Sequence, residues 1–221
     1  VMGILTGVAA GDTIGVAPGA HWIATNGIQA GTATFDNSIM ASLEFMTDPD
    51  GNPATTDDVP DVVNNSWGVN ESFAGYLDCD SRWWDLIDNC EAAGVVLVWA
   101  AGNEGPVAGT VRSPADRAVN PYNCFSVGST SNHMPFTISS FSSRGPSLCG
   151  GVYAVKPEIS APGDTIYSSF PGGQYVIRNG TSMSAPHISG VVALMRQANP
   201  DVDVVTIKDI LMNTALDLGN A

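Results

Sequence analysis

Short apolar runs alternate along this chain with stretches in which apolar residues recur every three or four positions. The runs predict buried strands at residues 22–24, 62–63, 95–100, 125–128, 158–160 and 175–177. The periodic stretches between them predict amphipathic helices. Apolar strands that are separated by helices favour a mostly parallel sheet with helices on both faces. We therefore expect one α/β domain.

Four helices are expected from the periodic stretches and from the signals at their ends. One follows Asp36 and places on one face the apolar residues Ile39, Met40, Leu43 and Met46. The next lies between Ser81, as its N-terminal cap, and Gly94, as its stop. A long helix follows Ser182, and the last begins at Thr206, where Thr-Ile-Lys-Asp resembles a capping box.

Composition indicates a folded domain and argues against two classes of partner, nucleic acids and membranes. The 221 residues are 44% apolar and 14% charged, which allows a large core and excludes intrinsic disorder. Eight basic residues against 22 acidic ones give a net charge of −14, and this charge repels phosphate groups and anionic lipids. The longest strongly apolar run, residues 95–101, is too short to cross a bilayer. We expect neither a nucleic-acid nor a membrane partner.

The motif Asn-Gly-Thr-Ser-Met-Ser-Ala-Pro-His at residues 179–187 joins a predicted strand to the long helix. Ser182 stands where that helix begins, so its hydroxyl is expected to be exposed. The free N–H groups of the first turn can stabilise negative charge that builds on a substrate oxygen. A serine at such a boundary can also act only as a helix cap. The local pattern leaves both interpretations open.

A second motif, Ala-Ala-Gly-Asn-Glu-Gly at residues 100–105, follows the apolar run at 95–100. It places Asn103 at the carboxyl end of a strand, where open α/β sheets bind ligands. The side-chain amide of Asn103 can donate a hydrogen bond to a tetrahedral oxyanion. On its own, Gly-Asn is equally typical of a simple turn.

Together with four other segments, these motifs resemble the subtilisin-like serine proteases, or subtilases. The other segments are Val-Ala-Pro-Gly at 16–19, Val-Val-Asn-Asn-Ser-Trp-Gly at 62–68, Phe-Ser-Ser-Arg-Gly-Pro at 141–146 and Ile-Ser-Ala-Pro-Gly at 159–163. They keep the family's order along essentially the whole chain. The loop at 48–61 that runs into Asn-Asn-Ser-Trp resembles the bacillopeptidase F-type branch. The resemblance implies a three-layer subtilisin-like fold and a secreted endopeptidase that acts on polypeptides.

The resemblance also assigns roles to individual residues. Ser182 matches the nucleophile that forms the acyl-enzyme, and Asn103 matches the side chain of the oxyanion hole, beside the backbone N–H of Ser182. Glu104 matches a position at the rim of the pocket for the residue before the cleaved bond. Two segments match the walls of that pocket: Ser66, Trp67 and Gly68 in one, and Ala100, Ala101 and Gly102 in the other. Glycine suits such a wall because backbone approaches a substrate closely only where no side chain intervenes.

A general base for Ser182 is missing from the expected machinery. A serine nucleophile needs a base within hydrogen-bond reach, normally a histidine that a carboxylate orients. His187 follows Ser182 by five positions on the same predicted helix, which places it about 140° away around the axis. The remaining histidines, His21 and His133, stand in no motif of the family. None of the three is expected to serve as the base.

The family places its catalytic aspartate and histidine N-terminal to the region matched here. Its histidine belongs to a His-Gly-Thr-His stretch followed by Val-x-Gly, and this chain opens with Val-Met-Gly; residues 218–221 also stop short of the family's closing segment. We therefore expect residues 1–221 to be a partial catalytic domain that is inactive by itself. The alternative is a pseudoprotease or peptide-binding module. An α/β-hydrolase is disfavoured because it needs an acid and then a histidine after the serine, and only His187 follows.

Neither a metal nor another cofactor is expected to take part in the chemistry. The acidic loop that holds Asp48, Asp50, Asn52, Asp57, Asp58 and Asp61 suits either a structural calcium ion or a plain solvated surface, and it lacks the distal Glu of an EF-hand. The cysteines fit no zinc spacing and allow three disulfide pairings among Cys79, Cys90, Cys124 and Cys149. If residues 79–90 are mostly helical, the pairing of Cys79 with Cys90 is disfavoured by distance.

Overall fold

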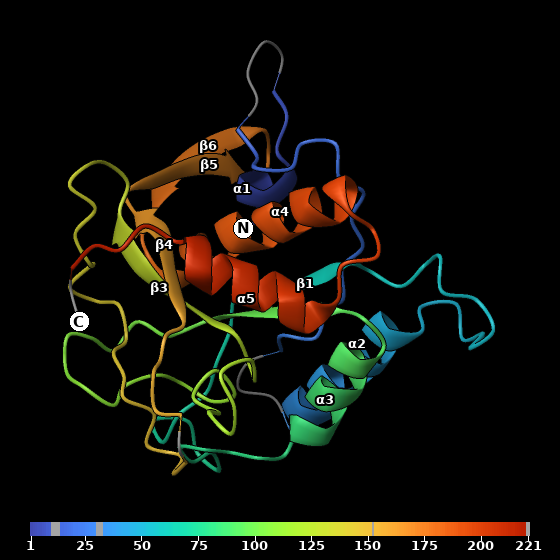
Figure 1. Cartoon of the computed structure of the whole chain (residues 1–221), viewed down its shortest axis with the longest axis horizontal. Coiled ribbons are helices and arrows are strands. Elements are labelled where there is room, and N and C mark those ends of the chain that lie inside the picture. The colour runs from blue at the N-terminus through green and yellow to red at the C-terminus, as the bar shows by residue number, and fades with distance from the viewer. Residues whose placement is uncertain (10–13, 30–32, 152, 220–221) are drawn as a thin grey trace.

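Four parallel strands form the central sheet of the computed structural model, which describes residues 1–9, 14–29, 33–151 and 153–219. Their order across the sheet is β1-β2-β3-β4 (Figure 1). The strands are β1 (Val62–Asn65), β2 (Val96–Ala100), β3 (Ser126–Ser131) and β4 (Ile159–Asp164). Each matches one of the apolar runs of the sequence, so the prediction of a parallel sheet is confirmed.

Strand β2 is buried on both faces, and its side chains divide between two cores. Val96, Val98 and Ala100 face the core formed with α4 (Thr181–Ala198) and α5 (Val204–Thr214). Leu97 and Trp99 face the other core, formed with α2 (Phe35–Thr47) and α3 (Trp84–Ala92). This alternation follows from the two-residue period of a strand. The sheet is therefore the middle of three layers, as expected.

Two smaller elements lie beside this sheet. The short helix α1 (Met2–Thr6) contacts α4, and an antiparallel hairpin is formed by β5 (Ile166–Phe170) and β6 (Gln174–Arg178). The hairpin leads directly into α4, as Figure 1 shows. Within the described residues, no helix has the length and apolar character of a bilayer-spanning segment.

Two of the strand predictions need correction. Residues 22–24 form no strand, and Trp22 is 62% exposed. Residues 175–177 do lie in a strand, β6, but this strand belongs to the hairpin and is mostly exposed instead of buried in the parallel sheet. In both places the apolar run is only three residues long, so its local composition does not reveal whether another layer covers it.

The helices were predicted correctly in kind, but several of their ends differ. Helix α3 begins at Trp84 with no side-chain cap, and Ser81 contributes only its carbonyl oxygen, to the N–H of Trp84 at 3.1 Å. Helix α5 begins at Val204, where Asp203 accepts from the N–H of Thr206 at 2.9 Å. Thr206 is therefore inside the helix, because the carboxylate of Asp203 is the better cap. Gly94 does follow the end of α3 with a φ of +96°.

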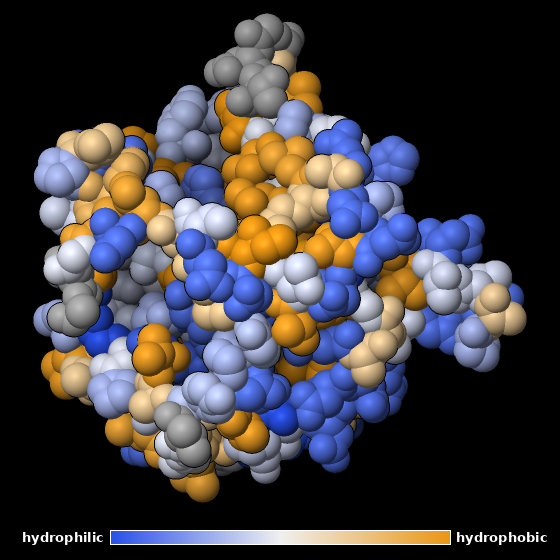
Figure 2. All heavy atoms as spheres, in the orientation of Figure 1, coloured by the Kyte–Doolittle hydropathy of each residue, from blue (hydrophilic) through white to orange (hydrophobic). Residues whose placement is uncertain are grey.

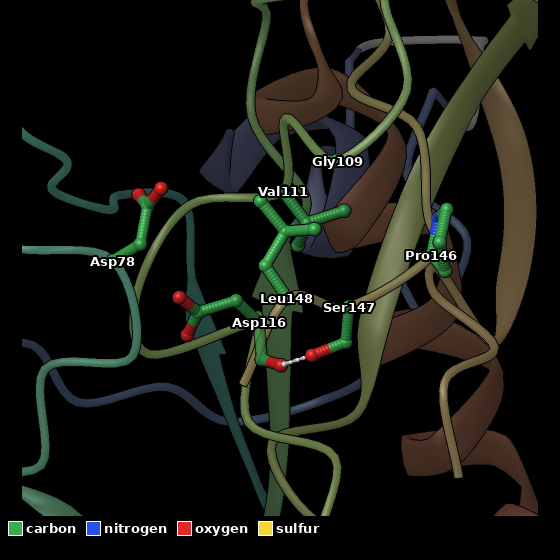
Figure 3. A pocket seen from close by; sticks show the side chains of 7 residues that line it. All are labelled: Asp78, Gly109, Val111, Asp116, Pro146, Ser147 and Leu148. Carbon is green, nitrogen blue, oxygen red and sulfur yellow. Dashed lines mark hydrogen bonds between the residues drawn. The ribbon is translucent and has the colours of Figure 1, made fainter. Parts of the chain in front are cut away.

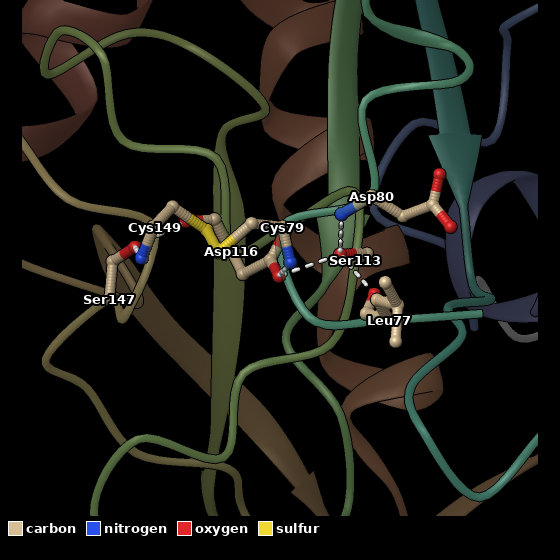
Figure 4. Close-up of a disulfide and its surroundings, with 7 residues drawn as sticks. All are labelled: Leu77, Cys79, Asp80, Ser113, Asp116, Ser147 and Cys149. Carbon is tan, nitrogen blue, oxygen red and sulfur yellow. Dashed lines mark hydrogen bonds between the residues drawn. A yellow bond between two sulfur atoms is a disulfide. The ribbon is translucent and has the colours of Figure 1, made fainter.

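A disulfide joins Cys79 to Cys149, while Cys90 and Cys124 are buried free thiols. The pairing of Cys79 with Cys90 is not formed, although Cys79 lies in a loop and not in a helix. Figure 4 shows Asp116 beside the disulfide, where its Oδ2 accepts from the N–H of Cys79 at 2.7 Å and from Ser113 Oγ at 2.6 Å. These bonds tie the loop after β1 to the segment at 113–116.

A shallow recess borders the disulfide and is closed by the loop that carries Cys149. Figure 3 shows its lining, in which Ser147 Oγ donates to the carbonyl oxygen of Asp116 at 2.6 Å. Leu148 lies over Gly109, where an added Cβ would meet the leucine side chain at 3.1 Å. The side chains leave no enclosed volume for a ligand.

Candidate active site

Ser182 lies in the first turn of α4, which begins one residue earlier at Thr181. Gly180 precedes the helix with a φ of +148°, a conformation that favours glycine, and it turns the chain from the hairpin into the helix. The N-cap residue is Gly180, which has no side chain to cap the helix, and Ser182 lies inside the first turn, so Ser182 is not the cap. Its Oγ donates to the carbonyl oxygen of Ser66 at 3.2 Å, and Ser66 Oγ donates to the carbonyl oxygen of Ser182 at 3.0 Å. The half-buried Ser182 is thereby held against the end of β1.

Asn103 lies beyond the end of β2 and is oriented by Thr181. Its Oδ1 accepts from the backbone N–H of Thr181 at 2.9 Å and from Thr181 Oγ1 at 3.2 Å. Among the described residues, none accepts from the Nδ2 of Asn103, and the residue is exposed. An amide whose oxygen is occupied in this way has its N–H groups left to donate. The structure thus brings an oriented, available donor next to the residue before Ser182.

Thr181 is a residue of this site to which sequence analysis assigned no role. Its side chain is fully buried, and Oγ1 also accepts from the N–H of Gly102 at 3.1 Å and lies 3.2 Å from the carbonyl oxygen of Gly102. The signal in the sequence was its place in Gly-Thr-Ser-Met. Its contacts with residues 102 and 103, which are 78 or more positions away, became visible only in three dimensions.

The two expected pocket walls direct most of their side chains into the hydrophobic cores. The indole of Trp67 packs edge-on against Trp83 and Trp99, with ring centroids 5.3 and 5.1 Å apart, so it belongs to the core next to α2 and α3. Ala100 and Ala101 are buried in opposite cores. What these segments can offer to a ligand is therefore mainly their backbone, at Gly68 and Gly102.

Glu104 forms an ion pair with Arg112, a residue to which sequence analysis gave no role. Its Oε2 also accepts from the backbone N–H of Asn103 at 2.8 Å and from Ser143 Oγ at 3.2 Å. Arg112 in turn donates its backbone N–H to the carbonyl oxygen of Ala101 at 3.0 Å. Glu104 and Arg112 therefore lie where the two wall segments meet.

None of the three histidines contacts Ser182 in the structure. His187 lies on α4, and its Nδ1 bonds to the carbonyl oxygen of Met183 at 2.8 Å; burial lowers the pKa of this imidazole below its ordinary value. His133 is exposed and bonds to Asn132, and His21 is also exposed. The expectation that His187 faces away from Ser182 agrees with this geometry.

A groove of about 1170 Å³ opens beside β1 and reaches Ser66. It is lined by residues 17–25, 27 and 28, by parts of α1, α2 and α4, and by the segment from Asp57 to Trp67. On the face shown in Figure 2, apolar side chains gather over α1 and α4, which border the groove. No strand in the described part of the chain pairs with the outer edge of β1. The groove thus leads from an open sheet edge to the residue that holds Ser182.

Three carboxylates gather in the acidic loop, away from Ser182. Asp48, Asp50 and Asp58 each place one oxygen within 4.8 Å of the others. Asp58 Oδ2 accepts from the N–H of Asp50 at 2.8 Å, whereas Oδ1 of Asp48 and Oδ1 of Asp58 are buried without a hydrogen-bond partner in the described structure. Unpaired carboxylate oxygens of this kind suit a hard cation such as calcium. Asp57 and Asp61 are not part of the group.

Comparison with known proteins places this geometry in context. The sequence model of the subtilase family, Peptidase_S8, matches residues 2–221. Bacillopeptidase F of Bacillus subtilis (strain 168) is 38% identical over 214 residues, which cover 92% of this chain and 14% of that protein. M-protease of Shouchella clausii (strain KSM-K16) is 32% identical, over 94% of this chain and 46% of that protein. The chain therefore spans less than half the length of either relative.

Solved structures of several proteases are similar to this chain in fold. A structure titled S41 Psychrophilic Protease matches with a TM-score of 0.68 and 28% identity, over 85% of this chain and 57% of that one. A cold adapted subtilisin-like serine proteinase also has a TM-score of 0.68, at 25% identity, over 92% of this chain and 63% of that one. Sphericase, at 24% identity and a TM-score of 0.66 over 81% of this chain and 55% of that one, supports the fold alone.

Proposed function

The chain belongs to the subtilase family, and from that premise we propose that it is the part of a serine endopeptidase that carries the nucleophile, Ser182. The Oγ of Ser182 attacks the carbonyl carbon of the scissile peptide bond and forms an acyl-enzyme, which water then hydrolyses. The substrate is a polypeptide. Secretion of the whole protein is part of the same proposal, and the acidic net charge of −14 agrees with it.

The observation that carries this proposal is the orientation of Asn103. Because Thr181 occupies its Oδ1, the Nδ2 can donate to an oxygen that becomes negative during attack by Ser182. The backbone N–H of Ser182 lies in the first turn of α4, where helix N–H groups lack intrahelical acceptors. Two donors of this kind beside one serine hydroxyl make an oxyanion hole.

We propose that the general base comes from outside residues 1–221. Ser182 Oγ donates to a backbone carbonyl, which is no base, while His187 and His133 make their contacts elsewhere and His21 is exposed. Ser66, which is hydrogen-bonded to Ser182, lines the groove beside β1, so a segment bound in this groove could bring an imidazole to Ser182. Loss of the histidine alone costs subtilisin, a member of this same family, about 10⁶ in turnover. The 221 residues by themselves are therefore proposed to be inactive.

A fluorophosphonate probe tests the assignment, because it labels a serine only when a base activates it. We expect rapid stoichiometric labelling at Ser182 in the full-length protein that contains these residues, and no labelling after Ser182→Ala. Ser184, a fully buried serine on the same helix, provides the control variant Ser184→Ala, which should still be labelled if it folds. Hydrolysis of casein by the Ser182→Ala protein would refute the nucleophile.

A non-catalytic peptide-binding module is the alternative, and the same experiment separates the two. If the full-length protein binds peptides but neither labels nor cleaves them, the protein is such a module. Fast labelling of the isolated 221 residues would instead contradict the proposal that the base lies outside them.

For the acidic loop we propose a structural calcium ion that takes no part in the chemistry. The buried, unpaired oxygens of Asp48 and Asp58 support this, and Asp50 completes the carboxylate group. Calcium should then raise the melting temperature over that in EGTA, and Asp58→Asn should remove the difference. The control is Asp57→Asn, an exposed neighbour outside the group, which should keep it. Equal melting temperatures with calcium and with EGTA would leave the loop as a plain acidic surface.

A further inference from the structure

Arg112 joins the two segments that the proposed function assigns as pocket walls. Its backbone N–H donates to the carbonyl oxygen of Ala101 at 3.0 Å. The next residue, Ser113, exchanges two backbone hydrogen bonds with Val69, at 2.8 and 2.9 Å. Residues 112–113 therefore lie between the wall that ends at Gly68 and the wall that ends at Gly102. Of these two residues, Arg112 is the one with a large side chain.

The aliphatic stem of Arg112 passes between the two glycines. A Cβ on Gly68 would lie 3.0 Å from the Cβ of Arg112, and a Cβ on Gly102 would lie 3.1 Å from its Cγ. The arginine thus occupies the space beside Gly68, and at Gly102 it shares the space with Glu104 Oε2 and Ser143 Oγ, each 2.6 Å from such a Cβ. A large apolar side chain of a substrate would have to displace this stem in order to enter.

The guanidinium group has more donors than the protein uses. Nη2 pairs with Glu104, Nη1 is 3.4 Å from the carbonyl oxygen of Gly68, and Nε is buried without a partner in the described structure. Glu104 is shared among several donors, because its Oε2 also accepts from the N–H of Asn103 and from Ser143 Oγ. Roughly a quarter of each of the two charged side chains remains exposed (24% and 26%), so an incoming group can reach them.

We propose that Arg112 determines the side-chain preference of this protease, favouring Asp or Glu immediately before the cleaved bond. A substrate carboxylate can take up the guanidinium donors that Gly68 and Glu104 leave unused, since arginine binds carboxylates through two parallel N–H groups. The stem of Arg112 at the same time disfavours large apolar residues at that place. The inference rests on the proposed function, because the pocket has this meaning only if Ser182 attacks a peptide.

Three peptide substrates that differ only in the residue before the cleaved bond, Glu, Gln or Phe, test the inference in the full-length protein. We expect kcat/KM for Glu to exceed that for Gln by about tenfold or more, the range of a charge-assisted hydrogen bond. Arg112→Met keeps the stem and removes the charge, so the ratio of Glu to Gln should fall to about one while Phe stays poor. Arg112→Gly removes the stem as well, and Phe should then become the best of the three.

Glu104→Gln is the complementary variant, because it removes the carboxylate that competes for the guanidinium. It should increase the preference for Glu over Gln. Fluorophosphonate labelling of Ser182 in every variant verifies that the site is folded. The inference is overturned if the unaltered protein cleaves after Phe or Gln as well as after Glu, or if Arg112→Met leaves the ratio unchanged, while labelling persists. Absence of both cleavage and labelling in the unaltered protein would instead refute the proposed function, and the inference with it.

Discussion

Thr181 organises the candidate site through a single hydroxyl. Its Oγ1 lies between the backbone of Gly102 and the Oδ1 of Asn103, and it is completely buried. A buried hydroxyl that bridges two segments fixes their relative position, because each lost bond would leave a polar group unpaired. The direction in which Asn103 can donate therefore depends on the fully buried side chain of Thr181.

Replacing Thr181 by valine removes this hydroxyl and nearly preserves the shape of the side chain. If the full-length protein is the proposed protease, its kcat should fall by about tenfold, with KM changed little, because only the charge of the transition state loses support. Complete loss of an oxyanion donor costs about 10²–10³ in kcat, a value known from subtilisin, a member of this same family. Thr181→Ser, which keeps the hydroxyl, is the matched control. Unchanged kcat in the valine variant would contradict this role.

His187 predicts a pH dependence of stability. Burial lowers the pKa of its imidazole, so the folded protein favours the neutral ring that donates to Met183, whereas the unfolded chain takes up a proton below about pH 6.5. The contribution of His187 to the free energy of unfolding is present in full above about pH 6.5. It is lost as the pH falls toward the lowered pKa, at up to about 1.4 kcal/mol per pH unit. His187→Gln should flatten this part of the pH profile in urea unfolding.

The exposed His133 provides the control for that measurement, since His133→Gln should keep the profile of the unaltered protein. An unchanged slope in the His187→Gln protein would show that other groups cause the acid sensitivity.

At the scale of elements, an apolar run predicts a strand, but whether that strand is buried depends on the elements that pack against it. The run at 95–100 predicted β2 well, because a strand that is apolar at every position is buried on both faces wherever it lies in a parallel sheet. The run at 175–177 has similar apolar residues, yet β6 is an exposed hairpin strand. Whether a short run is covered depends on which elements pack against it, and these come from distant parts of the chain.

At the scale of elements, the Cys79–Cys149 bond predicts a large effect on stability. The two residues are 70 positions apart, and closing a loop of that length restricts the unfolded chain by about 4 kcal/mol in the chain-entropy model. The double variant Cys79→Ser, Cys149→Ser should lose up to that amount in the free energy of unfolding. A reducing agent should destabilise the unaltered protein to a similar extent and leave the double variant unaffected. Equal stability of the double variant and the unaltered protein in the absence of reducing agent would contradict the prediction.

The charge of the whole molecule sets how its stability responds to salt. With a net charge of −14, the excess carboxylates of the folded protein repel one another. At 0.1 M salt, such repulsion is screened between charges more than about 10 Å apart. With EGTA present to exclude calcium, sodium chloride should raise the melting temperature between about 0.02 and 0.5 M. Replacing the exposed Glu44 and Glu71 by glutamine should raise it at low salt and weaken the response. A melting temperature that falls with salt would mean that attractive ion pairs prevail.

The sequence by itself determined the three-layer α/β plan and the two motifs that meet at the site. Periodicity reports which side of a segment is buried, and Gly-Thr-Ser-Met together with Ala-Gly-Asn identified Ser182 and Asn103 as the candidate pair. The periodicity is a local signal, whereas each motif alone also suited a helix cap or a turn, and only their combination along the chain identified the pair.

Only the tertiary structure decided how distant segments meet. It showed that Thr181 orients Asn103, that Cys79 pairs with Cys149, and that the stem of Arg112 lies beside both Gly68 and Gly102. No local pattern carries this information, because these contacts join residues that are far apart in the sequence. They exist only after the sheet and its covering helices have brought those residues together, and the chemistry of the site depends on them.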